Sequence, residues 1–171
     1  MKKISILWSV LLYCVFTFIS YAGDEPKHSI IAASFTYHFY PPGKHNQYFN
    51  NEFIAYTQRT DYLNFADKFI IGTLKNSSDN RCLLLGVGRD WRQLNAKTKI
   101  VGVYAYVGEF FNDTFDECGR DGIYHDFDKI TGIGFAPYIY HGVKYNFINN
   151  LHLNGGLILP GVVSFTLQAT F

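Results

Sequence analysis

Apolar and polar residues alternate along most of this chain with a period of two. The segment 29–39 has an apolar face and a polar face, formed by Ile31, Ala33, Phe35, Tyr37 and Phe39 and by Ser34, Thr36 and His38. Successive side chains of a β-strand point to opposite sides of the sheet, so this pattern predicts a strand with two chemically different faces.

Seven further segments read as strands in the same way. They cover about 51–59, 65–74, 81–89, 99–110, 131–141, 151–159 and 162–171. The polar run 76–80 (Asn-Ser-Ser-Asp-Asn) predicts a turn, and 111–129 is the longest stretch that we expect to be irregular. Eight strands is an even number, as an up-and-down antiparallel barrel requires.

The first 22 residues have the form of a signal peptide. Lys2 and Lys3 precede an apolar run from 4 to 19, and Ser20, Tyr21 and Ala22 supply a small-x-small cleavage site. We therefore expect one barrel domain over 23–171. The alternative is an uncleaved N-terminal anchor helix, because the apolar run is near the lower length limit for a membrane span.

The rest of the chain has no uninterrupted apolar run long enough for a membrane helix. A closed barrel is the other way to cross a bilayer. The last segment alternates to its end at Phe171, and a terminal amphipathic strand that ends in Phe is the form seen in bacterial outer-membrane barrels. The predicted fold is therefore all-β, an eight-stranded antiparallel up-and-down transmembrane barrel in the outer membrane. A soluble periplasmic barrel of lipocalin type is the alternative.

The amino-acid composition agrees with a barrel and limits the classes of partner that the protein could bind. The chain is 48% hydrophobic, 18% aromatic and only 17% charged, which excludes a disordered tail, a coiled coil and a basic nucleic-acid-binding domain. Without Lys2 and Lys3, 13 of the 15 basic residues remain against 14 acidic ones, a formal net charge of −1. Net charge therefore gives no argument for nucleic acid or another polyanion as partner.

The positions of the cysteines, histidines and glycines bear on disulfide, metal and nucleotide sites. Cys82 and Cys118 could form a disulfide after export or stay as two separate thiols. His38 and His45 do not have the spacing of a zinc site, and Gly132 and Gly134 lack the third glycine of a nucleotide-binding loop. We therefore expect no metal and no cofactor.

His38 and Ser77 are the pair that could carry out catalysis. His38 ends the first predicted strand on its polar face, where it could act as a general base. In an up-and-down barrel the ends of strands one and three lie at the same end, so His38 and the turn that contains Ser77 share a rim. An imidazole and a hydroxyl are the minimum for acyl transfer. The alternative for His38 is a structural imidazole bonded to Tyr or Asn side chains.

Several short motifs together resemble the outer-membrane lipid A palmitoyltransferases (PagP-like). Tyr37-His38 is similar to that family's Trp-His pair, and Lys75-Asn76-Ser77 is similar to its Lys-Asp-Ser. Further matches are the run 48–52, Trp91-Arg92 and the run 159–161. Two departures are Asn76, which replaces the family's catalytic Asp, and the missing N-terminal amphipathic helix. Asp79 could replace that carboxylate only if the loop folds back.

The resemblance implies a monomeric acyltransferase that moves a palmitoyl chain from a phospholipid donor to a lipid A acceptor. It implies catalytic roles for His38 and Ser77, with Asn76 beside them, and substrate binding near Tyr37. Pro137 resembles a proline that opens a lateral gate for lipids. Gly88 is one of several strand glycines that could make room for an acyl chain, although narrow barrels also need glycine for curvature.

Two other functions stay open. A non-catalytic outer-membrane barrel could bind a partner or block a phage receptor through the acidic loop 112–128. A lipid A deacylase would use similar chemistry, but its His-x-Ser pattern is missing from the sequence.

Overall fold

The structure is a computed structural model that describes residues 27–39, 47–110, 115, 117–120 and 122–171. The predicted signal peptide, 1–22, lies outside these residues. The elements in chain order are β1 (His28–His38), β2 (Tyr48–Phe49), β3 (Ile54–Arg59), β4 (Lys68–Lys75), β5 (Arg81–Asn95), β6 (Thr98–Gly108), η2 (Cys118–Arg120), α2 (Gly122–Thr131), β7 (Phe135–Ile148), β8 (Leu151–Ile158) and β9 (Val162–Thr170).

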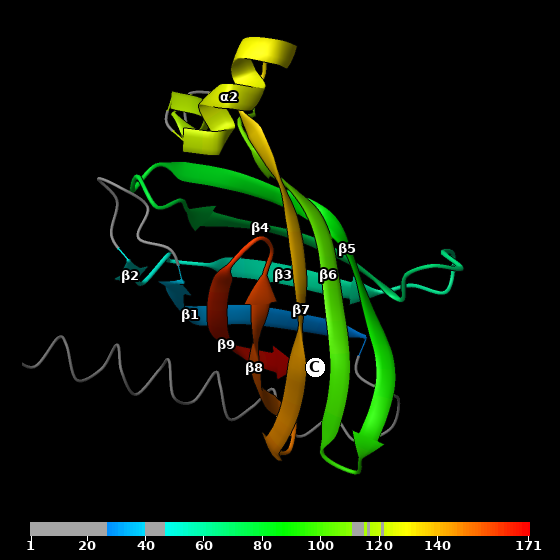
Figure 1. Cartoon of the computed structure of the whole chain (residues 1–171). Coiled ribbons are helices and arrows are strands. Elements are labelled where there is room, and N and C mark those ends of the chain that lie inside the picture. The colour runs from blue at the N-terminus through cyan, green and yellow to red at the C-terminus, as the bar shows by residue number, and fades with distance from the viewer. Residues whose placement is uncertain (1–26, 40–46, 111–114, 116, 121) are drawn as a thin grey trace, which may run out of the picture.

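The strands close into an antiparallel barrel (Figure 1). Sheet order runs from β1 through β3 to β9 in sequence, and β1 pairs with β9 from Ser29↔Thr170 to His38↔Val162. The two-residue β2 adds to β1 outside this circuit. The closed barrel has the eight strands that the sequence predicts, which confirms the all-β class and the up-and-down order.

The two ends of the barrel differ. The cap end carries His38, the turn 76–80, η2 and α2, while the terminal end holds the first and last described strand residues, where His28 N–H donates to the Phe171 carbonyl at 3.1 Å. In Figure 1 α2 lies above the barrel, and β6 and β7 extend downward from beneath it. The longest connections, from β1 to β3 and from β6 to β7, lie at the cap end, whereas two-residue turns join β5 to β6 and β7 to β8 at the terminal end.

A β-bulge changes the face assignment predicted for β1. The register with β9 shifts between Ala32 and Phe35, and Ala33 has a left-handed φ of 53°. Ile31 is consequently buried inside the barrel while Phe35 is exposed on its outer wall. The predicted single apolar face is therefore wrong, because one extra residue moves every later side chain to the other side.

Two strands are longer than predicted. β5 continues to Asn95 and β7 to Ile148, and both pair with β6 or β8 over the added length. β7 also begins at Phe135, later than the predicted 131. The extensions are polar or mixed in sequence, so the pairing partner, rather than the hydrophobic pattern, decides where these strands end.

A short helix occupies part of the segment expected to be irregular. α2 begins at Gly122, and Tyr124 packs against the core of the barrel. Burial raises the pKa of the Tyr124 hydroxyl to about 12, because the phenolate would have to leave water. The expectation of irregular structure over 111–129 is therefore wrong for the described helix, which the barrel core stabilises by contact.

A disulfide fixes this cap to the wall. Cys82 on β5 is bonded to Cys118 of η2, with Cα atoms 5.1 Å apart, and both side chains are fully buried. The disulfide alternative is thus the correct one. Inside the barrel, apolar side chains pack together from the cap toward the middle of the lumen, and the buried cluster comprises Ile31, Phe53, Ala55, Ile70, Leu74, Cys82, Leu84, Val107 and Cys118.

Candidate functional site

His38 lies where β1 ends at the cap end. Its side chain is half-buried, and the backbone N–H of His38 donates to the backbone carbonyl of Gln47 at 2.7 Å. Gln47 Nε2 donates in turn to the Tyr37 hydroxyl at 3.0 Å and to the His38 carbonyl at 3.4 Å. The structure therefore places the Tyr37-His38 pair on a backbone that β9 holds on one side and the Gln47 segment on the other.

Ser77 lies half-buried in the predicted turn at the same end, and Asn76 organises that turn. Asn76 Oδ1 accepts from the backbone N–H of Ser78 at 2.9 Å and of Asn80 at 3.0 Å, and its Nδ2 donates to the Cys118 carbonyl at 3.3 Å. A carboxylate could not make the last bond. The Asn76 amide therefore connects the turn to the cap.

The other predicted site residues are spread over the wall. Tyr37 is exposed and makes an edge contact with Phe39, their ring centroids 6.1 Å apart. Pro137 is exposed on β7 opposite Tyr106. Gly88 pairs with Lys68 near the terminal end, where the Lys68 side chain covers it. The structure thus gathers His38, Ser77, Asn76 and Tyr37 at the cap end and places Gly88 away from them.

Charged side chains join the loop before β3 to the turn after β4. Lys75 Nζ lies 3.0 Å from Glu52 and 2.9 Å from Asp79, and Arg81 also pairs with Glu52. The hydrogen bond from Lys75 is the main cause that lowers the pKa of Glu52, with Arg81 adding to it. Asp79 is engaged by Lys75 and strongly exposed.

Apolar packing leaves little space for an acyl chain in the described barrel interior. The apolar cavity in its middle has a volume of about 50 Å³, and its lining includes Tyr138, Tyr140 and Val103. Such a space holds a few water-sized groups. A long hydrocarbon chain would require the core side chains to move.

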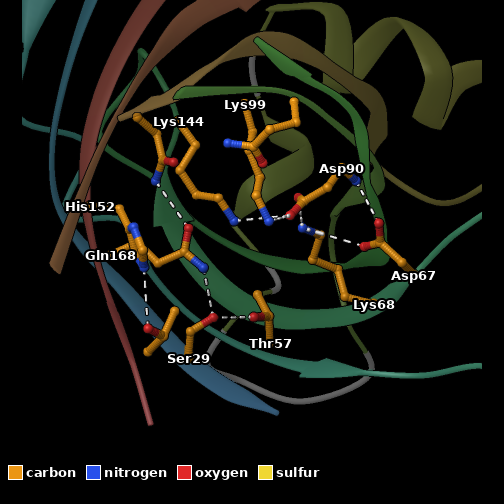
Figure 2. Close-up of polar contacts among 12 residues, drawn as sticks. Ser29, Thr57, Asp67, Lys68, Asp90, Lys99, Lys144, His152 and Gln168 are labelled. Carbon is orange, nitrogen blue, oxygen red and sulfur yellow. Dashed lines mark hydrogen bonds and ion pairs between the residues drawn. The ribbon is translucent and has the colours of Figure 1, made fainter. Parts of the chain in front are cut away.

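A polar cluster that the sequence pattern does not predict lies in the lumen toward the terminal end (Figure 2). Asp90 of β5 lies at its centre. Lys68 donates to Oδ1 of Asp90, Lys144 donates to Oδ2 at 3.1 Å, and Lys99 lies 3.8 Å from Oδ2. These lysines come from β4, β7 and β6, so three strands direct an ammonium group toward one carboxylate.

Asp67 supports this cluster from the loop before β4. Its Oδ2 accepts from the Asp90 backbone N–H at 2.6 Å. Its Oδ1 lies 3.4 Å from Lys68 Nζ, an ion pair that lacks hydrogen-bond geometry. The side chains of Asp90, Lys68 and Lys144 are only 12%, 13% and 12% exposed, so their charges interact with little screening by water.

Hydroxyl and amide groups line the opposite side of this lumen, where the barrel closes (Figure 2). Gln168 Nε2 donates to Ser29 Oγ at 2.7 Å, and Ser29 Oγ lies 2.5 Å from Thr57 Oγ1. Asn154 Nδ2 lies 3.4 Å from Gln168 Oε1, and His152 Nε2 lies 3.2 Å from Thr170 Oγ1. Strands β1, β3, β8 and β9 are therefore connected by side chains as well as by backbone.

These two clusters border a cavity of about 510 Å³ at the terminal end. Its lining includes Lys68, Lys99 and Lys144 on one side and Ser29 and Gln168 on the other. The sequence does contain a signal for this cluster, since the three lysines stand at inward-facing positions near the ends of their strands. The formal net charge of −1 does not reveal the cluster, because net charge does not report where the charges lie.

Comparisons of the chain with protein-family models, with curated proteins and with solved structures return no significant match. No helix in the described part of the chain is long and apolar enough to span a membrane.

Proposed function

We propose that this chain is a bacterial outer-membrane barrel that acts through its cap end. The observation that carries the proposal is the outer wall, where large apolar side chains are exposed on strand after strand; they include Ile30, Phe35, Ile54, Phe69, Ile71, Leu85, Val143, Leu153, Leu157, Phe165 and Leu167. Exposure of such an apolar surface to water is unfavourable, whereas the hydrocarbon chains of a bilayer would cover it.

Aromatic residues toward the terminal end support the same proposal. Trp91, Tyr104 and His141 form a contact series, with ring centroids 6.4 Å apart for Trp91 and Tyr104 and 5.4 Å apart for Tyr104 and His141. Arg89 lies over the Trp91 ring at 4.9 Å. Such amphipathic rings are typical of the membrane–water interface.

Cell fractionation and electrophoresis test the membrane proposal. The full chain, expressed in a Gram-negative host, should fractionate with the outer membrane and migrate faster in unheated than in heated samples, as folded barrels do. Recovery in the soluble periplasm would favour the lipocalin-type alternative and overturn the proposal.

The packed interior favours a binding function for the cap. The disulfide holds η2 against the wall, Tyr124 packs on the core, and Ile123 and Ile130 of α2 are exposed. A rigid cap that presents apolar side chains suits contact with a partner or the blocking of a phage receptor. Phage should adsorb less to cells that express the protein than to cells that lack it. In cells that express the double variant Ile123→Ser with Ile130→Ser, adsorption should return to the level without the protein. The matched pair Tyr62→Ser with Phe65→Ser, exposed rings in the segment between β3 and β4 at the terminal end, controls for lost apolar surface.

Lipid A acylation is the second candidate, supported by the presence of His38 and Ser77 at one end of the barrel. Here His38 takes the Ser77 hydroxyl proton as Ser77 Oγ attacks the phospholipid ester, and it returns that proton to the lysophospholipid that leaves the resulting acyl-serine. A lipid A hydroxyl then gives its proton to His38 and attacks the acyl-serine, and the acyl chain passes to lipid A while Ser77 takes the proton back from His38. Mass spectrometry of lipid A from expressing cells tests it. An added acyl chain that disappears in both His38→Ala and Ser77→Ala supports the enzyme, and unchanged lipid A in the wild type contradicts it.

A further inference from the structure

The cavity at the terminal end carries a strong excess of positive charge. Among the described residues its lining includes six basic side chains and one carboxylate, that of Asp90; the basic ones are Lys27, Arg59, Lys68, Lys97, Lys99 and Lys144. Asp67 adjoins the cluster and adds a second carboxylate. Close to half of the 13 basic residues that follow the predicted signal peptide therefore gather at one opening.

Internal ion pairing does not neutralise this charge. Lys68, Lys99 and Lys144 all approach Asp90, so at least one ammonium group has no carboxylate of its own even when Asp67 is counted. Two of the three lysine side chains are largely shielded from water. Like charges held this close repel each other, and an additional anion would relieve the repulsion.

Polar atoms without partners lie along the same cavity. His152 Nδ1 and Asn146 Oδ1 are buried, and neither has a hydrogen-bond partner among the described residues. Both residues line the cavity. Since buried polar atoms in native proteins are nearly always bonded, these two atoms leave unused hydrogen-bonding capacity beside the cavity.

We propose that this cavity binds a small multivalent anion of phosphate chemistry between Lys68, Lys99 and Lys144. A phosphate group offers several acceptor oxygens and two negative charges, which match converging ammonium groups that each donate as a point charge. The volume of about 510 Å³ leaves room for more than the phosphate itself. This site is separate from the cap-end function and does not depend on it.

Two sources could supply this chemistry, namely a free phosphate compound or the headgroup of an anionic phospholipid. Calorimetric titration of the folded full-length mature chain in non-ionic detergent separates them. One arm uses inorganic pyrophosphate, and the other uses short-chain phosphatidic acid, whose phosphate monoester also ionises twice, each against sodium chloride at matched ionic strength. Saturable binding of pyrophosphate identifies a free compound, and binding of phosphatidic acid alone identifies the headgroup.

Charge variants place the site. Lys144→Gln should weaken binding about tenfold, since it removes one charge-assisted hydrogen bond. Lys129→Gln makes the same charge change on the exposed surface of α2 at the other end and should leave binding unchanged. If Lys144→Gln fails to fold, Lys99→Gln serves instead, because Lys99 is 37% exposed and lies farthest from Asp90.

Asp90→Asn provides an opposite test. The variant leaves the lysines without their central carboxylate, so pyrophosphate should bind more tightly than to the wild type and should raise the thermal midpoint of the variant more than that of the wild type. Failure of both ligands to bind, or equal weakening by Lys144→Gln and Lys129→Gln, would overturn the proposal.

Discussion

Gln168 on β9 donates from Nε2 to Oγ of Ser29 on β1 at 2.7 Å, although 139 positions separate them in the chain. The bond lies inside the barrel at the seam where the first and last strands meet. Gln168 also contacts Asn154, so its amide joins three strands. The seam is therefore held by buried side chains in addition to its backbone ladder.

Gln168→Ala should destabilise the barrel by about 1–2 kcal/mol, because it removes the two buried hydrogen bonds that join Gln168 to Ser29 and to Asn154. Urea unfolding in detergent, followed by tryptophan fluorescence, measures the change. Gln58→Ala removes an exposed glutamine on the neighbouring β3 and should have little effect. Equal losses in the two variants would contradict a specific role for the seam.

The Cys82–Cys118 disulfide should matter for the cap. It closes a loop with a sequence separation of 36, and loop-closure entropy predicts a loss of about 4 kcal/mol when it is removed. We expect Cys82→Ser with Cys118→Ser to lower the urea midpoint and to make α2 sensitive to protease. Protection of α2 equal to that in the oxidised wild type would show that packing alone holds the cap.

Two glycines on β5 form a matched pair. A Cβ at Gly86 would lie 2.5 Å from Cα of Ala105 on β6, whereas a Cβ at Gly88 would mainly meet the flexible Lys68 side chain, 2.9 Å from its Cε. Gly86→Ala should therefore cost about 1–3 kcal/mol by pushing backbones apart, and Gly88→Ala clearly less. Refolding yield and urea midpoints compare them; a larger loss for Gly88→Ala would refute this ranking.

Acid should weaken the contacts of Glu52 at the cap end. The pKa of Glu52 is lowered, chiefly by the hydrogen bond from Lys75, so its contribution to stability is complete above its ordinary value of 4.5 and is lost as pH falls through the lowered pKa. Urea midpoints between pH 7 and 3 should fall less for Glu52→Gln than for the wild type. Because Glu52 is exposed, the difference should be small, and parallel curves would contradict it.

Much of the fold could be predicted from local pattern. Eight alternating segments and the Asn-Ser-Ser-Asp-Asn turn specify the strands, since side-chain direction alternates with every residue and turn chemistry is local. The placement of His38 and Ser77 at one end follows from strand order alone. Whether they act together stays a prediction.

What the sequence alone determined was the number and order of strands, the closed antiparallel class and the candidate rim. Tertiary structure decided the rest. The bulge at Ala33 reversed the face of Phe35, because register depends on the partner strand. The core stabilised α2 through Tyr124. The barrel's narrow lumen brought Lys68, Lys99 and Lys144 around Asp90, a meeting of four strands that no local pattern or net charge could reveal.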